Sequence, residues 1–391
     1  MKSEWRKIKV GDLGEVITGK TPKTSVLENY GGSTPFLTPS DNMSVKYVTR
    51  TARTLSSKGL DEVRKKLLPA DSVCVSCIGS DLGKVVMTTE PTVTNQQINS
   101  VVVDTSRFNP SFVYYAMTIL GKQLNFIGKT STAVPIVNKA SFSSYEILCP
   151  SLNTQSKISS VLSSLDNKIS LNQKINDNLD QQAQALFTSW FVDYSQFGGS
   201  VPHNWKEIRF EDFLTASKEK SDNPEIPMYS VTDTGIHPRD EKFKKNLSMK
   251  HAKNKVIHQN NLVFGMSREI LNWGVMRDPI GGVSSAYNVY EVSKRVNSFY
   301  LEAYMKANIQ YFKDLIKPAA REGQGIDKAV LMQKILLLPP DEVLDTYYQL
   351  ENPLREIQKT LAVEIQNLKQ IRDTLLPKLM SGEIDVSDIS M

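Results

Sequence analysis

The segment from Gly14 to Thr21 matches the sequence pattern of a phosphate-binding loop. It reads Gly-Glu-Val-Ile-Thr-Gly-Lys-Thr, which satisfies Gly-x4-Gly-Lys-Thr. In a nucleotide hydrolase this loop follows a buried strand and opens a helix whose N–H groups hold the phosphates. Here the residues from Lys7 to Asp12 are too polar for a buried strand, and Pro22 disfavours a helical backbone at Thr21. We therefore expect a strand at this segment, and a nucleotide hydrolase is the competing class of function.

Two shorter motifs could also carry chemistry. The segment from Asn109 to Phe112, Asn-Pro-Ser-Phe, is similar to the motif with which amino-methyltransferases hold a flipped base. No glycine-rich cofactor loop precedes it, however, and Asn followed by Pro is a typical helix start. Cys74 and Cys77 have the spacing of half a zinc site, but they lie in an alternating, strand-like run that places them on opposite faces. We therefore expect no catalytic residue, no metal and no cofactor in this chain.

Composition limits the remaining classes of function. The chain has 391 residues, enough for two domains, and no apolar run approaches the ~18 residues of a membrane span. Its first residues do not form a signal peptide, so we expect a cytoplasmic protein, and three cysteines predict no disulfide framework. The net charge of +5 permits a polyanionic partner. Six lysines and no acid occur between Lys242 and Lys255, which could be a binding patch or a solvated face.

The chain repeats itself. Pro150 and Pro339 end two matching stretches that are 189 residues apart, and other matches occur in the same order in both halves. The matching pairs are Trp5–Ile8 and Trp205–Ile208, Phe36–Asp41 and Met228–Asp233, Arg107–Asn109 and Arg295–Asn297, Ile147–Pro150 and Leu336–Pro339, and Asn178–Leu179 and Asn367–Leu368. The chain is therefore predicted to consist of two divergent copies of one unit.

Each copy begins with a mixed α+β module. Short β-type runs occur at Val73–Ile78, Ser100–Val103 and Leu262–Phe264, and Asn109 with Pro110 predicts a helix start. We expect a first domain at 1–150 and a second at 196–340, each followed by a helical region, at 151–195 and at 341–391.

The helical regions carry the apolar 4-3 spacing of a coiled coil. In the first region the seam is Ile158, Leu162, Leu165, Ile169, Asn172, Asn176, Leu179, Ala183, Leu186 and Trp190. In the second region it is Leu354, Ile357, Leu361, Leu368, Ile371 and Leu375. A helix of ~33 residues cannot bury such a stripe alone, and a two-fold axis relating the copies requires the two helices to pair antiparallel. Asn172 and Asn176 are interpreted as residues that penalise a wrong register.

Several of these stretches resemble the specificity subunits of Type I restriction–modification enzymes. Those that resemble the family's helical regions are Ser163–Ile169, Asn172–Leu179, Ala183–Phe187, Ser189–Asp193 and Arg372–Ile384. Those that resemble its module openings are Ile17–Pro22, Pro35–Leu37 and Thr94–Gln97. The resemblance covers essentially the whole chain, although the second module lacks the Gly-x-Thr-Pro and Asn-Gln-Gln stretches.

The resemblance implies a sequence-specific DNA-binding subunit without catalytic activity. Each module would recognise one half of a split double-stranded DNA target, and the helices would set the spacing between the halves. The helices would also dock two methyltransferase subunits, which use S-adenosylmethionine, and two restriction subunits with ATP-dependent translocase activity would complete the complex. A purely structural coiled-coil adaptor is the other alternative.

Candidate DNA contacts follow from residue type and expected loop position. In the first module they are Lys20, Thr21, Lys23, Lys46, Arg50, Arg53, Ser80, Lys84, Asn95, Gln96, Gln97 and the expected loop from Gly128 to Thr132 with Lys129 and Thr130. In the second module they are Lys244, Lys245, Lys250, Lys253, Arg268, Asn272, Trp273, Arg277, Arg321 and Gln324.

Overall fold

The computed structural model describes residues 5–130, 135–221, 223–239, 254–316 and 325–388. The chain divides into two compact units. Unit 1 comprises residues 1–176 and 359–391, and unit 2 comprises residues 177–358. Unit 1 therefore takes its residues from both ends of the chain. None of the described helices combines the length and the apolar character needed to cross a membrane.

Besides parts of the two long helices, the described residues of unit 1 form two sheets, a strand pair and three shorter helices. The five-stranded sheet has the order β2 (Gly14–Thr18), β10 (Ile98–Val103), β7 (Val73–Ser76), β8 (Val85–Thr88) and β4 (Tyr47–Val48). The four-stranded sheet has the order β5 (Arg53–Leu55), β3 (Tyr30–Leu37), β9 (Thr92–Thr94) and β6 (Leu67–Leu68). The antiparallel pair is β1 (Arg6–Lys9) with β11 (Glu146–Cys149), and the helices are α1 (Ser57–Val63), α2 (Pro110–Thr130) and α3 (Lys139–Ser144).

Helix α2 covers the five-stranded sheet of unit 1. It begins at Pro110 because the Asn109 side chain accepts a hydrogen bond from the Phe112 N–H at 3.1 Å. Its apolar residues recur every three to four positions, so one face is buried in the same core as the sheet residues. The expected helix start at Asn109 and Pro110 is confirmed.

Unit 2 contains smaller sheets. The four-stranded sheet has the order β13 (Leu214–Ala216), β21 (Asn288–Val292), β18 (Leu262–Phe264) and β19 (Trp273–Val275). The others are the three-stranded sheet of β14 (Lys220–Ser221), β17 (Asn254–His258) and β20 (Ile280–Val283), the hairpin of β15 (Tyr229–Thr232) and β16 (Gly235–Pro238), and the pair of β12 (Lys206–Arg209) and β22 (Ile335–Leu338). The short helices are α5 (Ser298–Ala307) and α6 (Lys328–Gln333).

The two units share one arrangement of helices and strands, which we call the frame. Helix α3, strand β11 and the long helix α4 (Leu152–Phe191) have the same lengths as α6, β22 and the long helix α7 (Asp341–Met380), 189 residues later. Strand β10 is likewise matched by β21 in order and partner strands. The α+β fold with two related modules and two long helices is therefore confirmed. The units differ outside this frame, because the four-stranded sheet of β5, β3, β9 and β6 has no four-stranded counterpart in the same order among the described residues of unit 2.

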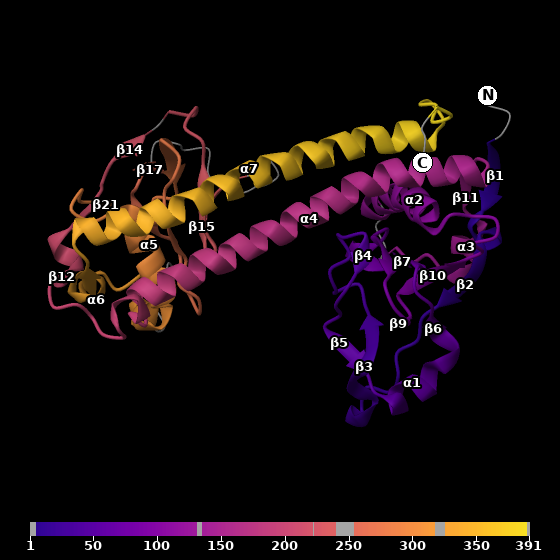
Figure 1. The fold of residues 1–391 in the computed structure, drawn as a ribbon, viewed down its shortest axis with the longest axis horizontal. Coiled ribbons are helices and arrows are strands. Elements are labelled where there is room, and N and C mark those ends of the chain that lie inside the picture. The colour runs from indigo at the N-terminus through magenta and orange to yellow at the C-terminus, as the bar shows by residue number, and fades with distance from the viewer. Residues whose placement is uncertain (1–4, 131–134, 222, 240–253, 317–324, 389–391) are drawn as a thin grey trace. The chain divides into compact units, whose positions relative to one another are not determined.

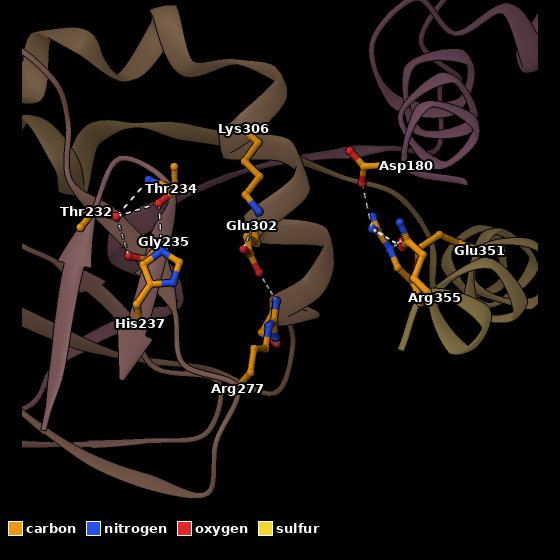
Figure 2. Close-up of polar contacts among 12 residues, drawn as sticks. Asp180, Thr232, Thr234, Gly235, His237, Arg277, Glu302, Lys306, Glu351 and Arg355 are labelled. Carbon is orange, nitrogen blue, oxygen red and sulfur yellow. Dashed lines mark hydrogen bonds and ion pairs between the residues drawn. The ribbon is translucent and has the colours of Figure 1, made fainter. Parts of the chain in front are cut away.

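The long helices pair antiparallel, and each is a continuous ribbon in Figure 1. In unit 1, Arg372 of α7 donates to Asp166 of α4 at 2.9 Å, and Lys168 lies 3.4 Å from Glu364. In unit 2, Arg355 of α7 lies 3.5 Å from Asp180 of α4 and also binds Glu351, as Figure 2 shows. The partner's residue number falls as the number along α4 rises, which confirms the antiparallel orientation.

The seam of α7 differs from the predicted one. Leu361 is buried, and Leu354, Leu368 and Leu375 are partly buried, but Ile357 and Ile371 are each 47% exposed, so the prediction is wrong for these two. Buried or partly buried side chains at other positions of α7 include Glu351, Gln358, Ile365 and Arg372, and Arg372 binds Asp166 of α4. Three of these positions are polar, so the 4-3 spacing of apolar residues is not visible there in the sequence. Ile357 and Ile371, each one residue before one of these polar positions, gave a false match to the spacing instead.

On α4, seven of the expected seam positions are buried. They are Ile158, Leu162, Ile169, Asn172, Leu179, Ala183 and Trp190, whereas Leu165, Asn176 and Leu186 are partly buried. Asn172 is fully buried, and neither its amide nitrogen nor its oxygen has a hydrogen-bond partner among the described residues. An unpartnered buried amide costs stability, which fits a residue kept for register, and that role stays a prediction.

Candidate nucleic-acid interface

The segment from Gly14 to Thr21 has no geometry for binding a nucleotide phosphate. Gly14–Thr18 is strand β2, paired antiparallel with β10, and its continuation also hydrogen-bonds to neighbouring strands. The Gly19 N–H donates to the Ile98 carbonyl at 3.1 Å and the Lys20 N–H to the Thr94 carbonyl at 2.9 Å. A Cβ on Gly19 would lie 2.2 Å from two carbonyl oxygens, so the glycine serves close backbone approach. The N–H groups that would hold a phosphate are already used.

The other two motifs have structural roles. The Asn109 side chain caps α2 and accepts a hydrogen bond from the Ser159 hydroxyl of α4 at 3.0 Å, which leaves no base-holding geometry. Cys74 of β7 and Cys77, which follows that strand, lie in different apolar clusters, as expected for opposite sides of the chain. Burial raises the pKa of the Cys74 thiol to about 12. Among the described residues, no group of three or more His, Cys, Asp or Glu could hold a metal ion.

In unit 1, several candidate DNA contacts lie together where β2 ends and β10 begins. The Thr21 hydroxyl donates to the Gln96 side chain at 2.6 Å, and the Asn95 amide donates to the Gln97 side chain at 2.9 Å. The Cys77 N–H donates to the Gln97 carbonyl, which brings the loop between β7 and β8 beside them. We call these three loops, Gly19–Thr21, Asn95–Gln97 and Gly79–Lys84, the loop edge of unit 1.

The loop edge of unit 1 presents groups suited to DNA. Lys20, Ser80, Lys84 and Gln96 are exposed, although Lys84 forms an ion pair with Asp81 at 2.6 Å. Asn95 is only 8% exposed and orders the loop through its hydrogen bonds to Gln97. Amide side chains can pair with base edges and lysines with phosphates. A pocket of about 230 Å³ lies beside this edge and is lined by Ser80 and Lys129, among others.

Four candidates of the first module lie elsewhere. Lys46 is buried, and its ammonium group donates to Ser111, Tyr115 and Ser163, so its assignment to DNA is wrong. Arg53 stacks on the rings of Tyr30 and Phe36 beside the four-stranded sheet. The backbone of Lys23 is held by Glu62 of α1, and Arg50 is exposed between β4 and β5.

The expected loop at Gly128 is helical. Helix α2 continues to Thr130, and Lys129 lies exposed on its last turn. A Cβ at Gly128 would lie 2.9 Å from the Leu82 side chain. The absence of a side chain at this position therefore allows the helix to pack closely against Leu82. The Thr130 side chain and residues 131–134 lie outside the described residues.

In unit 2, two candidates have partners within the protein. Trp273 is 4% exposed and belongs to the core, so it is not free to stack on a base. Arg277 forms an ion pair with Glu302, which also binds Lys306, as Figure 2 shows. The Arg277 guanidinium further lies 3.7 Å from the centroid of the Phe299 ring. The prediction for Trp273 is wrong because the residue is buried, whereas Arg277 has protein partners that residue type alone does not show, and its contact with DNA stays a prediction.

The other candidates of unit 2 divide into two groups. Arg268 is exposed in the loop between β18 and β19, where Asn272 closes the loop by donating its N–H to the Ser267 hydroxyl at 2.9 Å. Lys244, Lys245, Lys250, Lys253, Arg321 and Gln324 lie outside the described residues.

Sequence reasoning missed a group of three lysines in unit 2, which we call the lysine trio. Lys220 of β14 lies directly opposite Lys255 of β17, and Lys328 opens α6. The pKa of Lys255 is lowered by burial first and then by the positive charges of Lys328 and Lys220. Its ammonium group donates to the Tyr287 carbonyl at 2.5 Å. Like charges on paired strands repel each other, and an anion would relieve that repulsion.

Comparisons with known proteins agree on one family. Residues 2–181 match the model of the Type I restriction modification DNA specificity domain. The MjaIX specificity subunit of Methanocaldococcus jannaschii is 26% identical over 99% of this chain and 95% of its own length. The HindI specificity subunit of Haemophilus influenzae is 38% identical over 38% of this chain and 32% of its own length. The crystal structure of a Type I system S subunit from M. genitalium has the same fold, with a TM-score of 0.54, 14% identity and 96% of each chain covered.

Proposed function

Because the chain belongs to the specificity subunits of Type I restriction–modification systems, the non-catalytic subunits that determine DNA target recognition in their complex, we propose that it recognises a bipartite double-stranded target, one half-site per unit. The observation that carries this proposal is the repeat itself. Two units share one frame but differ in the loops and sheets around it. Two related frames with different surfaces suit two different half-sites.

In this proposal, unit 1 contacts DNA through its loop edge. Lys20 and Lys84 neutralise phosphates, while Thr21, Ser80, Gln96 and Gln97 supply the hydroxyl and amide groups that pair with base edges. The hydrogen bond between Thr21 and Gln96 holds the two loops in one arrangement before DNA binds. Such preorganisation lowers the entropy lost on binding.

In unit 2, the lysine trio supplies phosphate contacts. Lys220 and Lys255 are paired across two strands, and none of the three lysines forms an ion pair within the described part of the chain. The partly desolvated Lys255 is fixed by its hydrogen bond to the Tyr287 carbonyl. A phosphate that accepts from these lysines would offset their mutual repulsion.

The outer faces of the long helices are proposed to dock two methyltransferase subunits. Large apolar side chains are exposed there: Leu171 and Ile175 on α4, and Leu350, Ile357, Val363 and Ile371 on α7. A groove of about 500 Å³ along α7 in unit 1 is lined by Asn367, Gln370, Ile371, Thr374 and Leu375. Exposed apolar stripes on paired helices are typical of sites for further helices. Two restriction subunits would complete the complex, which acts on cytoplasmic DNA.

The lysine trio can be tested in the assembled methyltransferase complex. We expect Lys220→Gln, Lys255→Gln and Lys328→Gln together to make the salt dependence of DNA binding shallower by up to ~2.7 in log K against log salt, since each lost phosphate contact removes ~0.9. The methylated sequence should stay the same, because phosphate contacts carry no base information. As a control, Lys206→Gln with Lys294→Gln removes two exposed lysines of unit 2 that do not belong to the trio. An unchanged slope in the triple variant would assign the trio a structural role only.

A further inference from the structure

The hairpin of β15 and β16 in unit 2 ends in an ordered polar tip. The Thr234 N–H donates to the Thr232 hydroxyl at 3.2 Å, and the two hydroxyl oxygens are 2.9 Å apart. The Thr234 hydroxyl also lies 2.9 Å from Nε2 of His237, as Figure 2 shows. Asp233, Thr234 and His237 are exposed. The tip therefore links two hydroxyls and an imidazole by hydrogen bonds at the protein surface, next to the exposed carboxylate of Asp233.

The base of the hairpin is anchored in the unit 2 core. Tyr229 and Val231 are each 5% exposed and belong to an apolar cluster with strands β17, β18 and β20. The Tyr229 hydroxyl donates to Asp278 at 2.6 Å. The Arg239 guanidinium donates to the Ser230 hydroxyl at 3.0 Å, which ties the two strands together. A tip on such a base keeps its polar groups in position, as base recognition requires.

A second exposed loop lies beside the hairpin. Gly265, which follows β18, and Gly274 of β19 approach the hairpin so closely that an added Cβ would lie 3.1 Å from Val231 and 2.9 Å from Ile236. This loop exposes Arg268, Glu269 and Ile270, the last with 59% of its surface exposed. We call Thr232–His237 together with Arg268–Ile270 the hairpin surface. On its other side, β15 adjoins β20, which belongs to the sheet that carries Lys220 and Lys255.

The corresponding segment of unit 1 is buried, and its polar side chains bind each other. Thr38 and Asp41 occupy the matching place in the repeat, and they are 7% and 8% exposed. Asp41 accepts hydrogen bonds from both the N–H and the hydroxyl of Thr38, at 2.7 and 2.9 Å. The two units thus share a frame but present different chemistry at this point. A chain that recognises two different half-sites needs such a difference.

We propose that the hairpin surface contacts the base edges of the second half-site, with Asp233, Thr234, His237 and Arg268 as the residues that determine its sequence. A two-stranded β-ribbon fits the major groove of B-DNA. There, hydroxyl and imidazole groups can accept or donate, a carboxylate can accept from the amino group of cytosine, and an arginine can pair with guanine. The lysine trio at the neighbouring sheet would hold the adjacent phosphates. This inference rests on the proposed function of the chain.

The test uses the full complex with the methyltransferase subunits and maps methylation on a library of randomised targets. With Thr234→Ala and His237→Ala together, we expect the first half-site to persist. Base discrimination should fall roughly ten-fold or more at one or two positions of the second half-site. Asp233→Asn, which keeps the shape of the tip, should change the preferred base at one position. The control is Thr215→Ala with His203→Ala, which removes the same side-chain types from exposed positions of unit 2 outside the hairpin surface.

The possible results separate the inference from the proposed function. If both half-sites persist unchanged in the double variant and in Asp233→Asn, the hairpin surface does not determine specificity, although a bipartite target in the wild type still supports the proposed function. Altered bases in the first half-site would likewise overturn the inference. If the wild-type complex methylates without a bipartite sequence, the proposed function itself fails. Copurification of each variant with the methyltransferase shows that it folds and assembles.

Discussion

At the scale of single residues, Lys46 shows how unit 1 uses a cation internally. Its ammonium group donates to Ser163 of α4 at 2.7 Å and to Ser111 and Tyr115 of α2 at 3.1 and 3.3 Å. The Tyr115 hydroxyl in turn donates to Asp166 at 2.6 Å. Burial lowers the pKa of Lys46 to about 8, although Asp166 and Asp71 act in the opposite direction. This network ties the recognition module to the long helix.

The pKa of Lys46 predicts a pH dependence of stability. In the unfolded chain this lysine stays protonated up to about pH 10.5, whereas in the folded chain it loses its proton near pH 8. Between these values the unfolded state binds more protons, so the free energy of unfolding should rise with pH. The gain is on the order of a few kcal/mol. Unfolding in denaturant at pH 7.5–10, compared between the wild type and Lys46→Met, measures the difference.

Comparison with the variant removes the contributions of other titrating groups. Since only the wild type carries this lysine, its stability relative to Lys46→Met should increase with pH above about 8. A relative stability that is flat or falls over this range would contradict a buried, partly desolvated ammonium group at position 46.

At the scale of elements, opposite charges match α4 to α7. Helix α4 supplies Asp166 and Asp180, and α7 supplies their partners Arg372 and Arg355. In the repeat, Arg355 occupies the place of Asp166, so the two copies of the helix carry opposite charges at one position. Pairing of α4 with α7 therefore keeps both ion pairs, whereas pairing of α4 with a second α4 would lose them.

The pair of Asp166 and Arg372 should contribute measurably to stability. Their side chains are only 10% and 27% exposed, and a hydrogen-bonded pair of this kind should show a coupling free energy of ~1–3 kcal/mol. The measurement is a double-mutant cycle with Asp166→Asn and Arg372→Gln. The exposed pair of Asp61 and Arg64 in α1 and the turn after it is the control, with an expected coupling below ~1 kcal/mol. Equal coupling free energies would mean that the ion pair of Asp166 and Arg372 is no stronger than an exposed ion pair.

The different burial of two side chains on α7, Leu376 and Ile371, gives a second prediction for the helices. Leu376 is 2% exposed in the unit 1 core, so Leu376→Ala should cost ~2–5 kcal/mol of unfolding free energy. Ile371 is 47% exposed, and Ile371→Ala should cost the isolated chain less than ~1 kcal/mol. If the outer face docks the methyltransferase, Ile371→Ala should instead weaken copurification of that subunit. Similar losses of stability in both variants would show that Ile371 is buried between the helices.

At the scale of the whole molecule, the long helices are the only covalent connections between the two units. The chain passes from unit 1 into unit 2 within α4, at Asn176, and returns within α7, after Gln358. If each unit recognises one half-site, the length of these helices should determine how far apart the half-sites lie.

Insertion of one heptad after Asn176 and another after Gln358 should lengthen the target spacer. Seven residues add ~10 Å of helix, which corresponds to about three base pairs. Both half-sites should persist, because the recognition loops are unchanged, and methylation mapping of the complex measures the spacer. The same seven residues inserted after the exposed Gly199 are the control and should leave the target unchanged. An unaltered spacer in the double insertion would show that the helices do not set the distance.

The sequence by itself determined the repeat, the α+β modules and the existence of the two long helices, since these depend on local patterns. The 4-3 spacing is visible along α4, where apolar residues occupy most seam positions. It is concealed along α7 by the polar residues Glu351, Gln358 and Arg372, which are buried or partly buried, and Arg372 binds Asp166 of the opposite helix. The isoleucines beside them, which are apolar but exposed, cannot be distinguished from seam residues without that partner helix.

Only the tertiary structure decided which polar side chains are available for DNA. Lys46, Trp273 and Arg277 have the residue types of DNA contacts, yet each is buried or paired by residues far away in the sequence. Conversely, Lys220 and Lys255 meet only through the register of β14 and β17, and Lys328 joins them from α6. Residue type sets what a side chain can bind, but its neighbours are set by strand pairing and helix packing over long sequence separations, which local patterns do not contain.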